Sequence, residues 1–315
     1  MCRLTAAPKA GTPRAWADVV GVQPGEAATE RSTGSSARDP CGAIRAAIDA
    51  TVTDMTTSTR PSARPFRPLA GRGALVTGGS RGIGRAITSR LAADGATVVF
   101  TYATSSDAPD TLVAENTESN GQVSAVQVDL ADPDQVTAGF AAADEVFRTA
   151  SVGLDIFVAN AGVFTSALLA EATVDEWDRV MAVNARGTFL TLAQATPRLR
   201  DNGRVVTVST VGTHWPSPGE GIYAASKAAV EQLTRVASRE LGHRGITANT
   251  ISLGPTDTEL LRASAQPGAV EGAAAMTALG RIGQPTDIAD LVALLVHPDS
   301  RWVTGQNIRA DGGLT

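Results

Sequence analysis

The sequence predicts an α/β fold in which helices cover both faces of one seven-stranded parallel sheet, a doubly wound arrangement. Three observations lead to this fold class. From Gly71 onward, short runs rich in β-branched residues alternate with longer amphipathic stretches, as strands alternate with helices in such folds. A glycine or proline ends or follows each of the clearest amphipathic stretches, and these residues are helix breakers. Finally, 43% of the residues are hydrophobic, which suffices for a full core.

The expected strands are short apolar runs bounded by turn residues. They cover residues 74–77, 97–102, 124–128, 156–159, 204–209, 246–251 and 307–310. The expected helices carry apolar residues at helical spacing, and the clearest cover residues 85–93, 174–194, 224–241 and 285–295. The chain has no internal repeat and no ligand spacing typical of a zinc or calcium site, so we expect one sheet and no metal.

Residues 1–68 differ in composition from the rest of the chain. They hold seven of the sixteen prolines, many Ala, Thr, Ser and Arg residues, and almost no aromatic side chains. Such a segment has too little apolar surface to offset the entropy of ordering it. We therefore predict a disordered N-terminal extension, followed by a single domain at residues 69–315. Met55 lies sixteen residues before Gly71, and the sequence leaves open whether the upstream part is an extension or a start-site artefact.

Charge and cysteine content narrow the class of protein. The formal net charge is -5 and the pI is about 5.3, which argues against a nucleic-acid partner, because such proteins present basic surfaces. Cys2 and Cys41 both precede the predicted domain, so that domain has no internal disulfide. No apolar run approaches the roughly 20 residues of a membrane span. We expect a cytoplasmic protein without membrane or nucleic-acid partners.

A glycine-rich turn follows the first expected strand and opens the first expected helix. In residues 77–84 the glycines with the closest approach to a ligand are Gly78, Gly82 and Gly84, with Ser80, Arg81 and Ile83 between them. Backbone N–H groups and the positive end of a helix can hold a pyrophosphate at such a turn. The spacing differs from the commoner Gly-x-Gly-x-x-Gly fingerprint, and glycine turns also serve structure alone.

The end of the second expected strand bears on which nicotinamide cofactor is bound. An acidic side chain there would bind the ribose 2′-hydroxyl and repel a 2′-phosphate. This chain has Tyr102, Thr104 and Ser105 in that segment, and no acid. Arg81 in the glycine turn can pair with a phosphate, although it can equally be a solvated arginine. The segment favours NADP(H) over NAD(H).

Tyr223 and Lys227 carry the expected chemistry. They are four positions apart, so they share one helix face. A nearby ammonium favours the phenolate, and we expect it to lower the tyrosine pKa from about 10 toward neutrality. Next to a bound nicotinamide, such a tyrosine would exchange a proton with a carbonyl oxygen during hydride transfer. The alternative is an ordinary pair on a helix surface.

These motifs occur together and in order: residues 77–84, Asp129-Leu130, Asn160-Ala161-Gly162, Asn184, Ser209, and Tyr223 to Lys227. In this combination, residues 71–315 resemble the short-chain dehydrogenase/reductases, in particular their 3-oxoacyl-[acyl-carrier-protein] reductase-like branch. The resemblance implies a Rossmann-type domain, a small carbonyl or secondary-alcohol substrate such as a 3-oxoacyl thioester or small ketone, and a homotetramer or homodimer.

The resemblance also implies roles for individual residues in an NADP-dependent oxidoreductase. Asp129 and Leu130 would contact the adenine, Asn160 the adenine-side ribose, and Thr258 the nicotinamide carboxamide. Ala161, Gly162, Gly254, Tyr223 and Lys227 complete the cofactor-binding set. For catalysis, Tyr223 would be the acid, Lys227 would lower its pKa and hold the ribose, Ser209 would polarise the carbonyl, and Asn184 would bind a relay water.

Several of these residues have simpler explanations. Asp129 can be a helix N-cap, Asn184 a helix irregularity or packing amide, and Ser209 a turn residue. Ser209 and Tyr223 are fourteen positions apart, one more than is usual in the family, which predicts an insertion in the loop at residues 214–218. His214 in that loop is expected to be a loop or pocket-wall residue. The competing function is a binding protein that senses NADP(H) or another nucleotide without turnover.

Overall fold

The computed structural model describes residues 67–104, 108–119, 121–264 and 268–315. The predicted extension therefore lies almost wholly outside the described residues, and so does Ser105. Within the described part of the chain, no helix is long and apolar enough to cross a membrane. No group of three or more His, Cys, Asp or Glu residues there could hold a metal ion.

The seven strands within these ranges form one parallel sheet, as predicted, in the order β3-β2-β1-β4-β5-β6-β7. The strands are β1 (Gly73–Val76), β2 (Thr97–Tyr102), β3 (Gln122–Gln127), β4 (Leu154–Ala159), β5 (Arg204–Thr210), β6 (Thr247–Leu253) and β7 (Asn307–Ala310). The chain builds outward from β1 to β3 and then crosses back to β4. The strand order therefore reverses between β1 and β4, and ligands bind at the carboxyl ends of strands at such a point.

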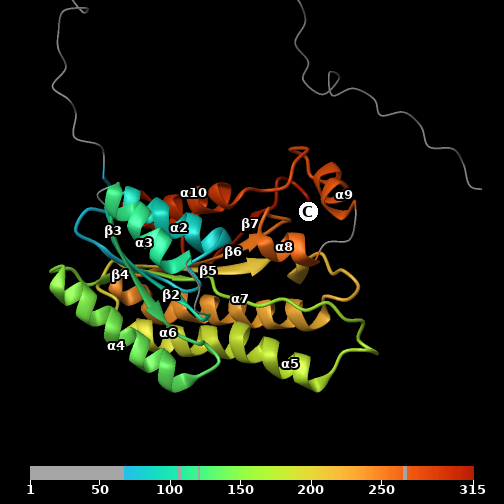
Figure 1. Ribbon diagram of the computed structural model, residues 1–315, viewed down its shortest axis with the longest axis horizontal. Helices are drawn as coiled ribbons and strands as arrows, with labels where there is room; N and C mark the ends of the chain where they lie inside the picture. Colours follow the sequence, from blue (N-terminus) through green and yellow to red (C-terminus); the bar gives the residue numbers. More distant parts are fainter. Residues whose placement is uncertain (1–66, 105–107, 120, 265–267) are drawn as a thin grey trace, which may run out of the picture. The chain divides into compact units, whose positions relative to one another are not determined.

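Helices cover both faces of the sheet (Figure 1). On one face lie α2 (Gly82–Ala93), α3 (Ala108–Glu118) and α10 (Pro285–Val296), and on the other lie α4 (Pro133–Thr149), α6 (Gly187–Arg198) and α7 (Gly221–Leu241). A hydrophobic core lies on each face of the sheet, and alternate residues of β1 pack into one core or the other, because successive strand side chains point to opposite faces. Ala74 and Val76 pack toward α2 and α10, while Leu75 packs toward α4 and α6. The α/β fold class is confirmed.

Shorter elements connect these helices and strands within the described residues. They are α5 (Val174–Val180), α8 (Glu259–Ser264) and α9 (Ala269–Met276), together with 3₁₀ turns η3 (Val211–Thr213), η4 (Gly242–Arg244) and η5 (Pro298–Ser300). Strand β3 begins two residues before the predicted 124, and β6 extends two residues past the predicted 251. Such shifts are ordinary, because burial rather than local sequence decides where a strand stops.

The helix expected at residues 174–194 is interrupted. It consists of α5, a π-helical segment η2 (Met181–Arg186), and α6, which runs to Arg198. Its start is well specified, because Thr173 and Glu176 form a capping box. The π-helical turn contains Asn184, and such turns occur often at functional sites. The expected single helix was therefore wrong in detail, and the alternative of a local irregularity at Asn184 is confirmed.

Candidate active site

The glycine turn between β1 and α2 is packed too closely to admit side chains. A Cβ on Gly84 would lie 2.0 Å from the Gly78 carbonyl oxygen, and one on Gly78 would lie 2.9 Å from Ala161 Cα. Gly78 and Gly82 also have positive φ angles of 65° and 53°, which glycine adopts at low cost. The turn after β1 thus lies directly against the loop that follows β4.

Two polar side chains fix that contact. The Thr77 hydroxyl accepts hydrogen bonds from the backbone N–H groups of Asn160 (3.0 Å) and Ala161 (3.1 Å). In return, Asn160 Nδ2 donates to the carbonyls of Thr77 (3.0 Å) and Gly78 (3.1 Å). Both amide protons of Asn160 are therefore used to hold the turn, which leaves Oδ1 for any contact with a ribose.

The turn has the features that a pyrophosphate requires. Gly82, Ile83 and Gly84 open α2, and Arg81 at its N-cap provides no side-chain hydrogen bond. The first N–H groups of a helix have no partner within it, so they can donate to an anion. A cavity of about 530 Å³ adjoins this helix end and is lined in part by Arg81, Gly82 and Thr258. The residues present therefore fit a dinucleotide, and Ser80 is half-buried in the same turn.

The end of β2 presents no carboxylate within the described residues. Tyr102 is half-buried and Thr104 is exposed there. Arg81 is exposed as well, and its nearest acidic partner is the exposed Glu259, with an N–O distance of 3.9 Å. An ion pair that is so exposed contributes at most about 1 kcal/mol. Its guanidinium can therefore exchange that partner for a phosphate.

The predicted adenine contacts occupy different environments. Asp129 is exposed and its Oδ1 accepts from the Ala131 N–H at 2.9 Å, whereas Leu130 is buried in the core. The N-cap of α4 is Asp132, whose carboxylate accepts from the N–H groups of Asp134 and Gln135. The alternative in which Asp129 caps the helix is therefore wrong.

The loop after β6 returns to the glycine turn. A Cβ added to Gly82 would lie 3.5 Å from Thr258 Cγ2, so Thr258 is adjacent to the start of α2. A Cβ on Gly254 would lie 2.7 Å from Asp311 Cα, so this position has no room for a side chain. The fold therefore brings Gly82 and Thr258 together from positions far apart in sequence.

Asn184 is fully buried, and its amide makes three hydrogen bonds. Oδ1 accepts from the Val163 N–H at 2.8 Å, while Nδ2 donates to the Val163 carbonyl at 2.9 Å and to Ser226 Oγ at 3.0 Å. Ser226 in turn donates to the Tyr223 carbonyl at 2.7 Å. The packing-amide interpretation is confirmed, and the amide links the loop after β4 to the first turn of α7.

Lys227 lies at the same place. A Cβ on Gly162 would lie 3.1 Å from Lys227 Nζ and 3.2 Å from Asn184 Oδ1. The Lys227 ammonium donates to the Val208 carbonyl at 2.9 Å, and the side chain is buried. Burial lowers the Lys227 pKa to about 8, because a charged group is less stable away from water. Gly162, Asn184 and Lys227 thus converge beside the loop after β4.

The pKa of Tyr223 differs from the prediction. Burial, followed by the negative charge of Glu220, raises it to about 12. The Lys227 ammonium lies 6.0 Å from the centre of the Tyr223 ring and donates to the Val208 carbonyl. The expected lowering toward neutrality was wrong, because burial and the Glu220 charge both raise the pKa of the phenol. The phenol is neutral at pH 7, which is the form that can donate a proton.

Ser209 also differs from its prediction. Its hydroxyl is buried and donates to Glu231 Oε1 at 2.7 Å, in the middle of α7. The same carboxylate oxygen accepts from Thr213 Oγ1 at 2.6 Å and Ser252 Oγ at 3.3 Å. The hydroxyl that the resemblance assigned to the substrate carbonyl therefore donates to a buried carboxylate in this structure.

Sequence reasoning missed Glu231, although a signal was present. Tyr223, Lys227 and Glu231 are spaced by four residues, so all three occupy one face of α7. His214 lies in the loop as expected, exposed, with its Nδ1 2.9 Å from Thr213 Oγ1.

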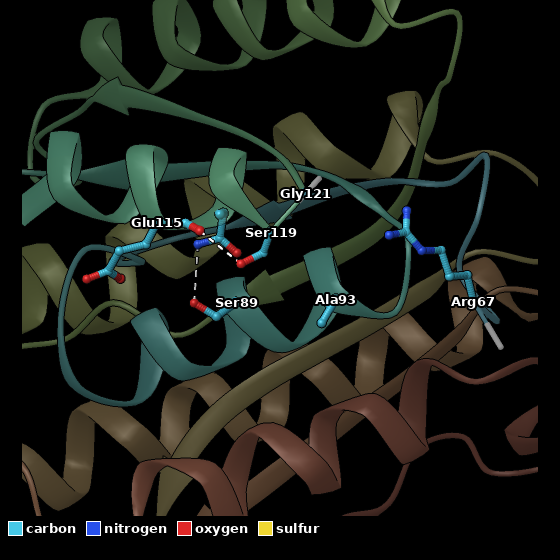
Figure 2. Close-up of a pocket in the computed structure, with 7 residues that line it drawn as sticks. Arg67, Ser89, Ala93, Glu115, Ser119 and Gly121 are labelled. Carbon is cyan, nitrogen blue, oxygen red and sulfur yellow. Dashed lines mark hydrogen bonds between the residues drawn. The ribbon is translucent and has the colours of Figure 1, made fainter. Parts of the chain in front are cut away.

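A second cavity is remote from this cluster. It has a volume of about 410 Å³ between α2 and α3 (Figure 2), where Arg67 lies at the opposite end from Glu115. Asn116 in its wall donates to the Leu112 carbonyl at 2.8 Å and weakly to Ser89 Oγ at 3.4 Å. None of the predicted site residues lines it, so the candidate site is the edge of the sheet between the glycine turn and α7.

Comparison with known proteins assigns the family. A family model described as enoyl-(acyl carrier protein) reductase matches residues 78–315. A short-chain dehydrogenase/reductase from Serratia marcescens has a similar structure, with a TM-score of 0.74 and 39% identity, covering 78% of this chain and 99% of that one. The chain belongs to the short-chain dehydrogenase/reductase family. It is accordingly an oxidoreductase.

Two further relatives of this short-chain dehydrogenase/reductase have names or structures that mention NADPH or NADP. The NADPH-dependent aldehyde reductase-like protein, chloroplastic, of Arabidopsis thaliana is 37% identical over 263 residues, which are 79% of this chain and 96% of the relative. A short chain dehydrogenase from Burkholderia cenocepacia, solved in complex with NADP, has a TM-score of 0.73 and 39% identity. It covers 78% of this chain and 99% of its own.

Proposed function

We propose that this chain catalyses the NADPH-dependent reduction of a small carbonyl compound to the secondary alcohol. The convergence of Tyr223, Lys227, Asn184 and Gly162 beside a glycine turn that fits a pyrophosphate is the observation that supports this most strongly. A 3-oxoacyl thioester and a small ketone are the substrate classes that we favour.

The cofactor is proposed to lie along the carboxyl edge, from the end of β2 to the loop after β6. The α2 N-terminus with Gly78, Gly82 and Gly84 would hold the pyrophosphate. Asp129 and Asn160 Oδ1 would face the adenosine half, and Thr258 and Lys227 the nicotinamide half. One ammonium proton of Lys227 is bonded to the Val208 carbonyl, which leaves two for ribose hydroxyls.

NADP(H) is the proposed cofactor in preference to NAD(H). The described end of β2 lacks the acid that would repel a 2′-phosphate. Arg81 is exposed and only weakly paired, so its guanidinium can bind that phosphate in a bidentate manner. The Burkholderia relative, which was solved in complex with NADP, is consistent with this preference.

In the proposed reaction, bound NADPH supplies the hydride that the carbonyl carbon accepts. Tyr223 gives its proton to the carbonyl oxygen as a general acid, and its neutral phenol is the required form. Lys227, still largely protonated at pH 7, stabilises the phenolate that is left. Asn184 is proposed to hold this arrangement together and to bind a relay water through its remaining Oδ1 lone pair.

Assembly and location are also proposals. A homotetramer or homodimer is supported by large apolar side chains that remain exposed on α5, α6 and α7, such as Trp177, Phe189 and Val236. A cytoplasmic location is proposed from the cysteine distribution, whereas the Arabidopsis relative is named as chloroplastic.

The test is NADPH oxidation by the purified chain against a panel of ketones, aldehydes and 3-oxoacyl thioesters, with Tyr223→Phe measured in parallel. We expect turnover on at least one carbonyl class and a 10²- to 10⁴-fold lower kcat in Tyr223→Phe, with unchanged NADPH affinity. Tight NADPH binding without consumption on any carbonyl would instead support a cofactor-sensing protein.

A further inference from the structure

We propose that Thr210, and not Ser209, presents the hydroxyl that polarises the substrate carbonyl. This inference rests on the proposed carbonyl reduction and assigns one further catalytic residue to it. The two hydroxyls are adjacent at the end of β5, but they differ in direction, burial and hydrogen-bond partners.

Ser209 has no proton left to give. Its side chain is 2% exposed, and its proton is donated to Glu231 Oε1 at 2.7 Å. A carboxylate is a strong acceptor, and hydrogen bonds to charged groups contribute about 1.5–3 kcal/mol each. Turning the Ser209 hydroxyl toward a substrate would break that bond and leave Glu231 less well satisfied inside the protein.

The contacts between β5 and α7 place Tyr223 beyond Ser209. Thr207 contacts Thr234 (2.8 Å) and Ser209 contacts Glu231 (2.7 Å), so the strand and the helix run in opposite directions. Tyr223 precedes Glu231 by eight residues, about 12 Å along the helix axis. It therefore lies past Ser209 in the direction of the carboxyl edge, where β5 ends at Thr210.

Thr210 has the exposure and the free proton that the role requires. It is half-buried at the last position of β5, where it is also the N-cap of the 3₁₀ turn η3 that leads toward α7. Its Oγ1 accepts from the Gly212 N–H at 3.1 Å. No described residue accepts its proton, so the hydroxyl is held on its acceptor side and free on its donor side.

Glu220 links Thr210 to Tyr223. A Cβ built on Gly212 would lie 3.4 Å from Thr210 Oγ1 and 3.0 Å from a carboxylate oxygen of Glu220. The charge of Glu220 also acts on the Tyr223 phenol. The Thr210 hydroxyl therefore lies near the Glu220 carboxylate, which precedes the first residue of α7. Ser209 instead donates to Glu231, about three turns further along that helix.

The sequence spacing agrees with this assignment. Thr210 and Tyr223 are thirteen positions apart, so the insertion inferred from the Ser209–Tyr223 distance is not needed. In the proposed reaction Thr210 donates a hydrogen bond to the carbonyl oxygen, and no covalent bond to threonine forms. As negative charge develops on that oxygen, the hydrogen bond strengthens and lowers the barrier.

The test compares Thr210→Val, Thr210→Ser and Ser209→Ala on the carbonyl that the wild type reduces best. Valine has the shape of threonine without the hydroxyl, so we expect kcat to fall by about 10²-fold or more, with NADPH affinity and Tm little changed. Thr210→Ser keeps the hydroxyl and should retain kcat within several fold. Ser209→Ala should retain kcat, with a lower Tm.

The opposite pattern would overturn the inference. If Ser209→Ala loses as much turnover as Thr210→Val, with cofactor binding and Tm retained, Thr210 has no special role. Thr210→Ala provides a second hydroxyl-free variant if valine prevents folding. A wild-type kcat in either variant would also show that the Thr210 hydroxyl has no catalytic role. Absence of turnover in the wild type would overturn the proposed carbonyl reduction as well. A failure of the Thr210 assignment alone would leave wild-type turnover intact.

Discussion

The glycine turn after β1 and the contact between β5 and α7 lie at the same edge of the sheet but depend on different physical constraints. The turn is limited by backbone sterics, since no Cβ fits at Gly78 or Gly84. The β5–α7 contact buries Lys227 and Glu231 among hydroxyls and carbonyls. The turn therefore stabilises the fold by its shape, whereas the contact places charged groups where burial costs free energy. Adding a side chain in the turn should therefore lower stability, whereas removing a buried charge from the contact should raise it.

The largest expected effect is in the glycine turn. Gly84→Ala would place a methyl group 2.0 Å from the Gly78 carbonyl oxygen, so the turn must open. We expect the free energy of unfolding to fall by about 3 kcal/mol and NADPH binding to be lost, as measured by denaturant titration and cofactor fluorescence. Gly272→Ala in α9 is the matched control. Outside its own helical turn, no atom of the described residues lies within 4 Å of its added Cβ, and we expect the substitution to be neutral or slightly stabilising. Equal losses in both variants would contradict the steric account.

Lys227→Met should have the opposite effect on stability and abolish turnover. The folded-state pKa of about 8 lies below the ordinary 10.5, so burial of the ammonium destabilises the fold below pH 8. Between pH 8 and 10.5 the unfolded chain binds more protons, so wild-type stability rises with pH in that window. Removing the charge should raise the unfolding free energy at pH 7 by at most about 3 kcal/mol.

Denaturant titrations of wild type and Lys227→Met from pH 6.5 to 10 check this difference. The difference in unfolding free energy between the variant and wild type should shrink as the pH approaches 10. The variant's gain is partly offset at every pH, because the Val208 carbonyl loses its hydrogen-bond donor. A variant less stable than wild type at every pH would show that the buried ammonium stabilises the fold, contrary to our account.

Arg81→Ala tests the exposed rim of the turn and should have a smaller effect. Its guanidinium has only a weak partner in Glu259, so stability should hardly change. We expect the Kd for NADPH to rise about 10-fold, consistent with the loss of one charge-assisted contact, and the Kd for NADH to stay nearly constant. Similar losses for both cofactors in isothermal titration would place Arg81 away from the 2′-phosphate.

The same two regions explain what the sequence could predict. The strands, the glycine turn and the residues of the cluster follow from local patterns, because apolar periodicity and glycine sterics act over a few residues. The direction of the Ser209 hydroxyl and the pKa of Tyr223 do not. They depend on Glu231, Glu220 and burial, which only the packed helix α7 brings together. The hydrogen bonds between Asn184 in the π-helical turn and Val163 likewise join residues that are 21 positions apart.

The protonation state of Tyr223 tests the account most directly. The chain has two tyrosines, Tyr102 and Tyr223, so the tyrosinate absorbance of Tyr102→Phe reports Tyr223 alone. We predict a Tyr223 pKa of about 12 for as long as circular dichroism shows a folded chain, and a lower value in Glu220→Gln. A Tyr223 phenolate that forms near neutral pH in the folded protein would contradict the account.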